Sequence, residues 1–257
     1  MKKIKMKQLL SLFYCCLFFW EGLSAFASAE KSAPSIFSNG RLGIGLAGEY
    51  AKIEADLKVR SPVSLGTFSS SQQQTCKKIQ VAPSLELGTS IMNDYYLGFL
   101  VSWHYSNAHT TSQSPVRGAY YFSHQFKLRY YTDAFIKPGY KLTPKTMIYG
   151  MVGASIANWS HTSDMFSFDQ ITQITRYINT FKMRASTVGL GVGCGFEYLI
   201  QDKYALSFEY KSYFHRSKTA SQSISYQYLG TRTGDLIKVV QPSYSTFAVR
   251  LTYFFSF

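Results

Sequence analysis

The chain has 257 residues, of which 46% are hydrophobic and 17% aromatic, and its formal net charge is +13. After the first 30 residues no apolar run approaches the roughly 18 residues that a membrane helix needs. This excludes a bundle of membrane helices. A basic protein can bind nucleic acid, but these charges are dispersed along the chain, which disfavours that function.

The first 29 residues have the pattern of a signal peptide. Lysines at positions 2, 3, 5 and 7 precede an apolar run over residues 9–20, which is too short to span a bilayer comfortably. Ala27 and Ala29 flank Ser28 as a small-residue cleavage site. We therefore expect cleavage after Ala29, export of the chain, and one mature domain over residues 30–257.

From residue 41 onward, apolar and polar residues alternate with a period of two, which indicates β-strands with one apolar and one polar face. The pattern predicts eight strands, at residues 41–53, 78–88, 95–105, 121–142, 147–156, 185–199, 204–214 and 244–257. The fourth keeps one phase throughout, with Lys127 and Arg129 facing away from Phe126 and Leu128. The fifth is apolar on both sides, so its facing stays open. Pro83 removes a ladder hydrogen bond and predicts a bulge in the second strand.

The connections alternate between long and short. Residues 61–75, 107–118, 158–181 and 217–241 are predicted to be loops, whereas the connections near residues 92–94, 143–146 and 201–203 are tight turns. Ile171, Ile174 and Ile178 predict a short helix in the third loop, and residues 224–228 could add strand to the last. An even strand number with this rhythm predicts an all-β fold: an eight-stranded antiparallel transmembrane β-barrel with four long extracellular loops.

The inward faces carry glycine, serine and charged residues. A soluble lipocalin-type barrel would place apolar residues there, so the polarity favours the membrane barrel. A barrel of eight strands is filled by side chains, and buried charges must pair. We expect a salt-bridged plug, with a gated ion path as the alternative, made by the lumen charges Glu49, Glu86, Arg129, Lys137, Glu197, Glu209, Lys211 and Arg250.

Cysteines and histidines suggest no further chemistry. Cys76 and Cys194 are predicted on different strands, so no disulfide is expected, although an oxidising compartment would permit one. The scattered histidines show no metal-ligand spacing. We expect neither a metal site nor a cofactor.

The last strand ends on alternating large side chains at Leu251, Tyr253, Phe255 and Phe257. It resembles the closing strand of Gram-negative outer-membrane barrels, which implies recognition by the barrel-assembly machinery. Residues 137–150 and 193–198 resemble the opacity-like, OmpA-type family of small outer-membrane barrels. The resemblance implies a non-enzymatic surface antigen, adhesin or envelope-structural protein. Expected partners are outer-membrane lipid, anionic lipopolysaccharide and, through the loops, host surface molecules.

One short motif suggests an enzyme instead. His104, Ser106 and Asn107 resemble the His-x-Ser-Asn motif of outer-membrane lipid A deacylases, in which a histidine base activates a serine nucleophile. Two residues apart in a strand, His104 and Ser106 share one face. That face is predicted to point into the lumen, and no Asp or Glu occurs between Asn107 and Thr132. The deacylase is therefore kept only as an alternative.

Overall fold

The computed structural model describes residues 40–61, 68–92, 94–115, 120–168, 175–200, 203–227 and 231–256. No helix in these ranges is long and apolar enough to cross a membrane. The described chain forms antiparallel strands: β1 (Arg41–Ser61), β2 (Phe68–Met92), β3 (Tyr95–Pro115), β4 (Tyr120–Thr143), β5 (Thr146–Phe168), β6 (Thr175–Ile200), β7 (Tyr204–His215), β8 (Lys218–Gln227) and β9 (Thr231–Ser256).

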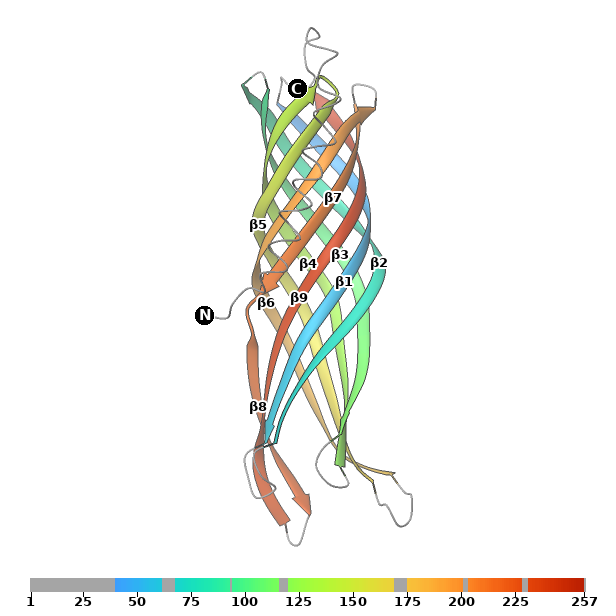
Figure 1. Ribbon diagram of the computed structural model, residues 1–257, viewed down its shortest axis with the longest axis vertical. Coiled ribbons are helices and arrows are strands. Elements are labelled where there is room, and N and C mark those ends of the chain that lie inside the picture. The colour runs from blue at the N-terminus through green and yellow to red at the C-terminus, as the bar shows by residue number, and fades with distance from the viewer. Residues whose placement is uncertain are drawn as a thin grey trace.

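The strands close into a barrel (Figure 1). Each pairs with the next from β1 to β7, β7 pairs with β9, and β1 pairs with β9 to complete the ring. After a break at residues 216–217, β8 follows β7 and pairs with the same strand, β9. The wall therefore has eight positions, which confirms the predicted eight-stranded antiparallel barrel.

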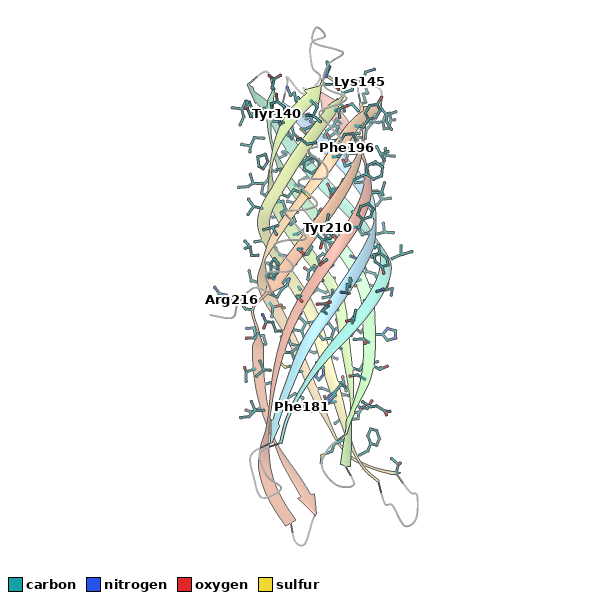
Figure 2. The ribbon with its side chains drawn as sticks, viewed as in Figure 1. Tyr140, Lys145, Phe181, Phe196, Tyr210 and Arg216 are labelled. Carbon is teal, nitrogen blue, oxygen red and sulfur yellow. The ribbon has the colours of Figure 1, made fainter. Side chains whose placement is uncertain are left out.

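An apolar belt surrounds the half of the barrel nearer the tight turns, here called the turn end, where Tyr140 and Lys145 are labelled in Figure 2. Strands cross a bilayer with about 9–11 residues, and the exposed apolar side chains occupy a stretch of about that length on β1, β2, β3, β4, β6 and β9 and a shorter one on β5 and β7. They include Ile44, Leu46, Tyr50, Ile79, Val81, Leu97, Phe99, Trp103, Ile136, Tyr140, Val152, Ile156, Val188, Leu190, Phe208, Phe247, Val249 and Leu251.

Inside the belt, charged, polar and small side chains lie among buried aromatic and sulfur-containing ones. The predicted facings of β1, β2, β3, β6, β7 and β9 match the burial of these strands. The facing of β5 is now settled, because Met147, Tyr149 and Met151 are buried while Val152 and Ile156 are exposed. An apolar exterior around a polar interior is the arrangement of a transmembrane barrel of the outer-membrane type, not of a lipocalin.

Beyond the belt, in what we call the far half, the strands run on where loops were predicted. Residues 68–75 pair with β1 instead of forming a loop, β3 reaches Pro115, and β5 reaches Phe168. This Ser/Gln-rich segment still forms a strand, because pairing with the neighbouring strand overrides weak intrinsic β-propensities. The predicted helix is wrong at Ile178, which lies in β6, and Ile171 and Ile174 fall outside the described residues. The added strand predicted near residue 224 is present as β8.

The bulge predicted at Pro83 is also wrong. Pro83 pairs in register with Leu46 of β1. On its other side the β2–β3 ladder begins only at Ser84 and Ser102 and continues toward the turn end. Proline has no N–H to donate, so its effect is to end a ladder rather than to insert a residue.

A bulge occurs in β4 instead and overturns its predicted phase. The register shifts between Tyr105 and Ala108 against β3, and between Leu128 and Tyr130 against β5. An extra residue re-aims the side chains that follow. Leu128 is therefore buried and Arg129 is exposed. Arg129 is not a lumen charge, which corrects the expectation from sequence.

The far half is not a closed ring. No ladder joins β2 to β3 beyond Ser84 and Ser102, and none in the described chain joins β6 to β7 or β8 beyond Gly189. Two four-stranded sheets result, called leaf A (β8, β9, β1, β2) and leaf B (β3, β4, β5, β6). Their ends stand apart at the bottom of Figure 1.

Candidate functional site

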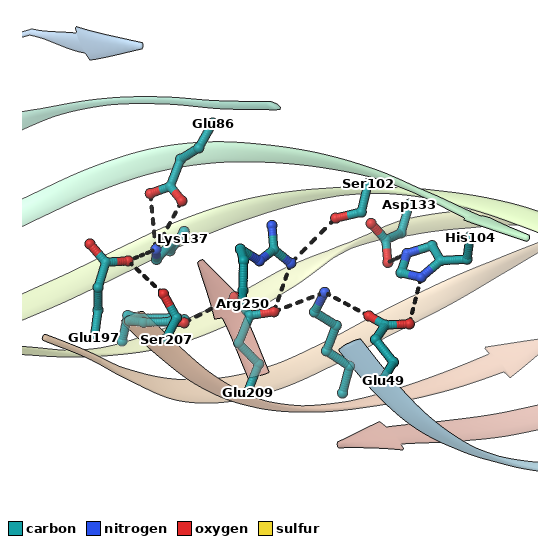
Figure 3. A network of polar contacts seen from close by, with 12 residues as sticks. Glu49, Glu86, Ser102, His104, Asp133, Lys137, Glu197, Ser207, Glu209 and Arg250 are labelled. Carbon is teal, nitrogen blue, oxygen red and sulfur yellow. Dashed lines mark hydrogen bonds and ion pairs between the residues drawn. The ribbon is translucent and has the colours of Figure 1, made fainter. Parts of the chain in front are cut away.

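The lumen of the belt is crossed by a chain of ion pairs (Figure 3). Nearest the turn end, Lys137 Nζ lies 2.6 Å from Glu197 Oε2 and 2.9 Å from Glu86 Oε1. Arg41 Nη2 donates to Glu197 Oε1 at 2.8 Å. Lys137 and Glu197 are fully buried, so these charges compensate one another rather than being screened by water.

Alternation along the strands places these groups. Inward positions of β2, β4 and β6 bring Glu86, Lys137 and Glu197 together from residues far apart in sequence. Aromatic rings complete the cage. The Arg41 guanidinium lies 3.8 Å from the centre of the Phe254 ring, and Lys137 Nζ lies 4.0 Å from that of Tyr149. Cation–π contacts of this kind strengthen when desolvated. The contact with Arg41 accounts for an aromatic side chain at Phe254, an inward position of β9 whose neighbours on that face are polar.

A second cluster lies deeper along the axis. Arg250 Nη2 donates to Glu209 Oε2 at 2.8 Å, and Lys211 Nζ lies 3.0 Å from the same oxygen. The Tyr149 hydroxyl donates to Glu209 Oε1 at 3.0 Å. Lys211 Nζ also lies 3.9 Å from Glu49 Oε1, which joins this cluster to a third.

The third cluster holds a histidine between two carboxylates. His104 Nδ1 is 2.7 Å from Glu49 Oε2, and His104 Nε2 is 2.9 Å from Asp133 Oδ2. The imidazole stacks on Tyr131 with ring centres 4.0 Å apart. Tyr213 donates a hydrogen bond to Asp133. Both ring nitrogens are thus used by acidic partners.

The charges of the three clusters nearly balance. Five carboxylates face four basic side chains, and a positively charged His104 would complete the balance. The members are Glu49, Glu86, Asp133, Glu197, Glu209, Arg41, Lys137, Lys211 and Arg250. Removing one partner of a buried pair leaves an uncompensated charge, which costs about 3–5 kcal/mol. The clusters therefore act as one structural unit.

Beyond the charges the lumen becomes apolar. Tyr131, Tyr213 and Tyr244 form an aromatic layer, with the rings of Tyr213 and Tyr244 centred 4.3 Å apart. Past this layer, Leu128 and Trp159 are buried in an apolar core that fills the beginning of the far half. Polar plug and apolar core together occupy the interior along most of its length.

Sequence reasoning placed seven of its eight lumen charges where the structure has buried side chains, and Arg129 was the exception. It missed Arg41, His104 and Asp133 as members of the same network. Arg41 shares the inward parity of Gly43 and Glu49, a signal that was available. The contacts of His104 with Glu49 and Asp133 could not be predicted from the sequence, because these residues lie on three different strands.

The His104 and Ser106 pair does not have the geometry of a catalytic relay. Carboxylates occupy both nitrogens of His104. The Ser106 hydroxyl is buried and has no hydrogen-bond partner among the described residues. Contrary to the expectation from sequence, carboxylates do reach this histidine, since Asp133 and Glu49 both contact it. What the motif lacks is a hydrogen bond between base and nucleophile.

Other predicted positions are placed only in part. Leu251 and Phe255 are exposed on the belt, Tyr253 is half-buried beside Tyr204, and Phe257 lies outside the described residues. Ala27 and Ala29 also lie outside them. Cys194 lies half-buried on the belt face and forms no disulfide with the described residues, and the Cys76 side chain is not described. Over the described ranges, no three His, Cys, Asp or Glu side chains group as a metal site.

No protein-family model matches the chain, and no curated protein matches it. Solved structures similar to it include the outer membrane protease OmpT from Escherichia coli, at 11% identity over 89% of this chain and all of that one, with a TM-score of 0.47. The outer membrane protein OprG from Pseudomonas aeruginosa is 13% identical, over 86% and 97% of the two chains, with a TM-score of 0.41.

The attachment invasion locus protein Ail of Yersinia pestis is 13% identical, over 84% and 99% of the two chains, with a TM-score of 0.35. These proteins include an attachment protein and a protease, so they share no single activity. At such low values the likeness carries no argument about function. The assignment of the fold rests on the strand pairings and on the apolar belt.

Proposed function

We propose that the chain is a non-enzymatic outer-membrane barrel that carries a surface-contact structure outside the cell. In this proposal the turn end faces the periplasm, and leaves A and B face outward. The anchored belt is closed by the charge network, and the leaves supply the surface for an antigen, adhesin or envelope-structural role. Assembly would use the terminal strand, as its resemblance to other closing strands implies.

The observation that carries the proposal is the length of the strands relative to the belt. Most have 21–26 residues, whereas about 9–11 suffice to cross a bilayer. At about 3.3 Å per residue, the surplus reaches on the order of 30 Å beyond the membrane. A projection of this size is unnecessary for a simple anchor, so we infer that it contacts other molecules.

Shortening the β1–β2 and β8–β9 hairpins of leaf A tests the contact role. The register pairs Asp56 with Gln73 and Ala220 with Lys238, so residues 57–72 and 221–237 can each be replaced by a two-residue turn without shifting the ladder. We expect cells displaying the intact chain to adhere to host-cell monolayers and cells with either shortened hairpin of leaf A to adhere less. Gel mobility before and after heating would check that each variant still forms a barrel. Equal adhesion of all three would contradict the proposal.

A narrow pore is the second candidate, supported by polar lumen atoms that lack partners. Within the described lumen, Arg250 Nε and Asp133 Oδ1 have no hydrogen-bond partner, and such atoms are those that a permeating ion would contact. Planar-bilayer recordings decide between the two. The proposal expects no steady conductance, whereas a pore would conduct and would change with Arg250→Gln or Glu86→Gln.

Lipid A mass spectrometry tests the deacylase alternative. Cells expressing the intact protein are compared with cells expressing Ser106→Ala. We expect the same lipid A from both, because His104 makes no hydrogen bond to Ser106. Loss of an acyl chain with the intact protein alone would make it an enzyme.

A further inference from the structure

A row of basic side chains lies on the outer face of leaf B, directly past the apolar belt. Lys127 of β4 is opposite Ser160 of β5, and Ser160 is opposite Arg184 of β6. Arg184 is exposed and Lys127 is half-exposed. Two strand spacings separate the Cα atoms of the two cations by about 10 Å, with the Ser160 side chain between them.

More cations extend this row. Arg129 is exposed next to Lys127, and Lys182 is exposed two residues from Arg184. Arg216 continues the row past the end of β7. Its backbone N lies 3.4 Å from the carbonyl oxygen of Val188, and Figure 2 shows Arg216 projecting from the wall. In the described part of the chain, none of these cations forms an ion pair. The acid described on this face is Asp164, which already accepts a hydrogen bond from Thr180.

The β4 bulge creates the row. With the uninterrupted phase of β4, Lys127 would point into the lumen and Leu128 would point outward. The extra residue reverses both at the point where the belt ends, marked by the exposed Tyr130. Bulges re-aim side chains in this way and are treated as purposeful features of a strand. The reversal exchanges a buried charge for one that lies at the level of lipid headgroups.

We propose that this row, Lys127, Ser160 and Arg184 with Arg129 beside it, binds the phosphates of a glycolipid of the lipid A type. The inference rests on the proposed outer-membrane location. Such a lipid carries a phosphate at each end of a disaccharide, and the row offers two cations separated by a hydroxyl. Its acyl chains would lie on the belt below, against Tyr130, Ile156 and Val188. Arginine and lysine both bind phosphate, through forked and single charged contacts respectively.

Two matched variants test the row. Lys127→Gln/Arg184→Gln removes two charges from it, whereas Lys145→Gln/Lys203→Gln removes two exposed charges from the tight turns. Native mass spectrometry of the full chain in detergent would measure binding of bisphosphorylated lipid A and of lipid A with both phosphates removed. Inorganic phosphate, added as a competitor, separates a lipid headgroup from a free anion. Heat-dependent gel mobility checks that each variant folds.

We expect the row variant to bind bisphosphorylated lipid A about thirtyfold more weakly, because each of the two lost surface cations contributes about fivefold to the affinity. The turn variant should match the intact chain, and removal of the phosphates should weaken binding by a similar factor. Equal binding by both variants, equal binding of dephosphorylated lipid A, or displacement by inorganic phosphate at millimolar concentration would overturn the inference. Adhesion of the row variant, measured separately, shows whether the surface-contact proposal fails with it.

Discussion

At the scale of single residues, the buried charges are held by opposite partners on other strands. Lys137 has two carboxylate partners, Glu86 and Glu197, and no contact with water. Such a pair adds little net stability through its own attraction, but removing one member is costly because its partners become uncompensated buried charges. A change at one member is therefore felt by the others.

Replacing Lys137 with Met should lower the free energy of unfolding by about 3–5 kcal/mol, because Glu86 and Glu197 lose their shared cation. Urea unfolding of the barrel in lipid vesicles, followed by tryptophan fluorescence, measures the change. Lys145→Met, at an exposed turn position, is the control and should change stability by less than about 0.5 kcal/mol. Adding Glu86→Gln to Lys137→Met should recover part of the loss, and no recovery would contradict the pairing.

Two glycines of β5 should respond oppositely to alanine. A Cβ at Gly153 would lie 1.9 Å from the backbone oxygen of Ala134, whereas a Cβ at Gly150 would meet no atom within 4 Å. A backbone atom of a paired strand has little room to move. Gly153→Ala should therefore cost about 1–3 kcal/mol, and Gly150→Ala should be neutral or slightly stabilising. The same urea experiment compares them, and similar losses for both would refute the close approach.

At the scale of whole strands, the β4 bulge decides which side chains see the lumen. Cysteine labelling can read this facing directly. In a background with Cys76 and Cys194 changed to serine, a membrane-impermeant maleimide should label Lys127→Cys and leave Leu128→Cys unlabelled, because the first faces outward and the second is buried. An unbroken phase predicts the reverse pattern, so the two readings are mutually exclusive.

Facing in the belt could be predicted from the sequence because lipid on one side forces alternation. In β6, Val188 to Tyr198 alternate with glycines and Glu197, and the structure follows this pattern. The far half has no lipid to impose it, so the Ser/Gln-rich start of β2 resembled a loop. The β4 bulge was equally hidden, because a register shift depends on which residues the neighbouring strands offer. The charge network was predicted from parity, but not its individual pairs.

At the scale of the whole molecule, one barrel divides into two leaves. The gap between β2 and β3 in the far half is here called the seam. Beyond Ser84 and Ser102, the backbone groups along the facing edges of β2 and β3 have no ladder partner across this seam. Unpaired edges are where strands recruit other strands. The leaves thus differ from the belt in how their backbones are protected, although both are built from the same chain.

Amide exchange should reveal this division. In the far half of β3, amides directed at β4 should exchange slowly and alternate amides directed at β2 should exchange quickly, because only the first set has a ladder partner. In residues 97–102 both sets should be slow. Hydrogen exchange measured by NMR on the protein in detergent micelles resolves individual amides, and uniform protection along β3 would show that the seam is closed.

Closure of the ring pairs β1 with β9, the first and last described strands, and places Arg41 opposite Ser256. Almost the whole chain must therefore be synthesised and delivered before this pairing can begin. Closing so long a loop carries an entropic cost before any contact rewards it, and non-local strand pairing is slow for that reason. Until β9 arrives, β1 presents a free edge whose apolar face has no lipid around it. The interval between export and closure is thus the time at which this protein is most prone to aggregate, and a helper that holds either edge would act then.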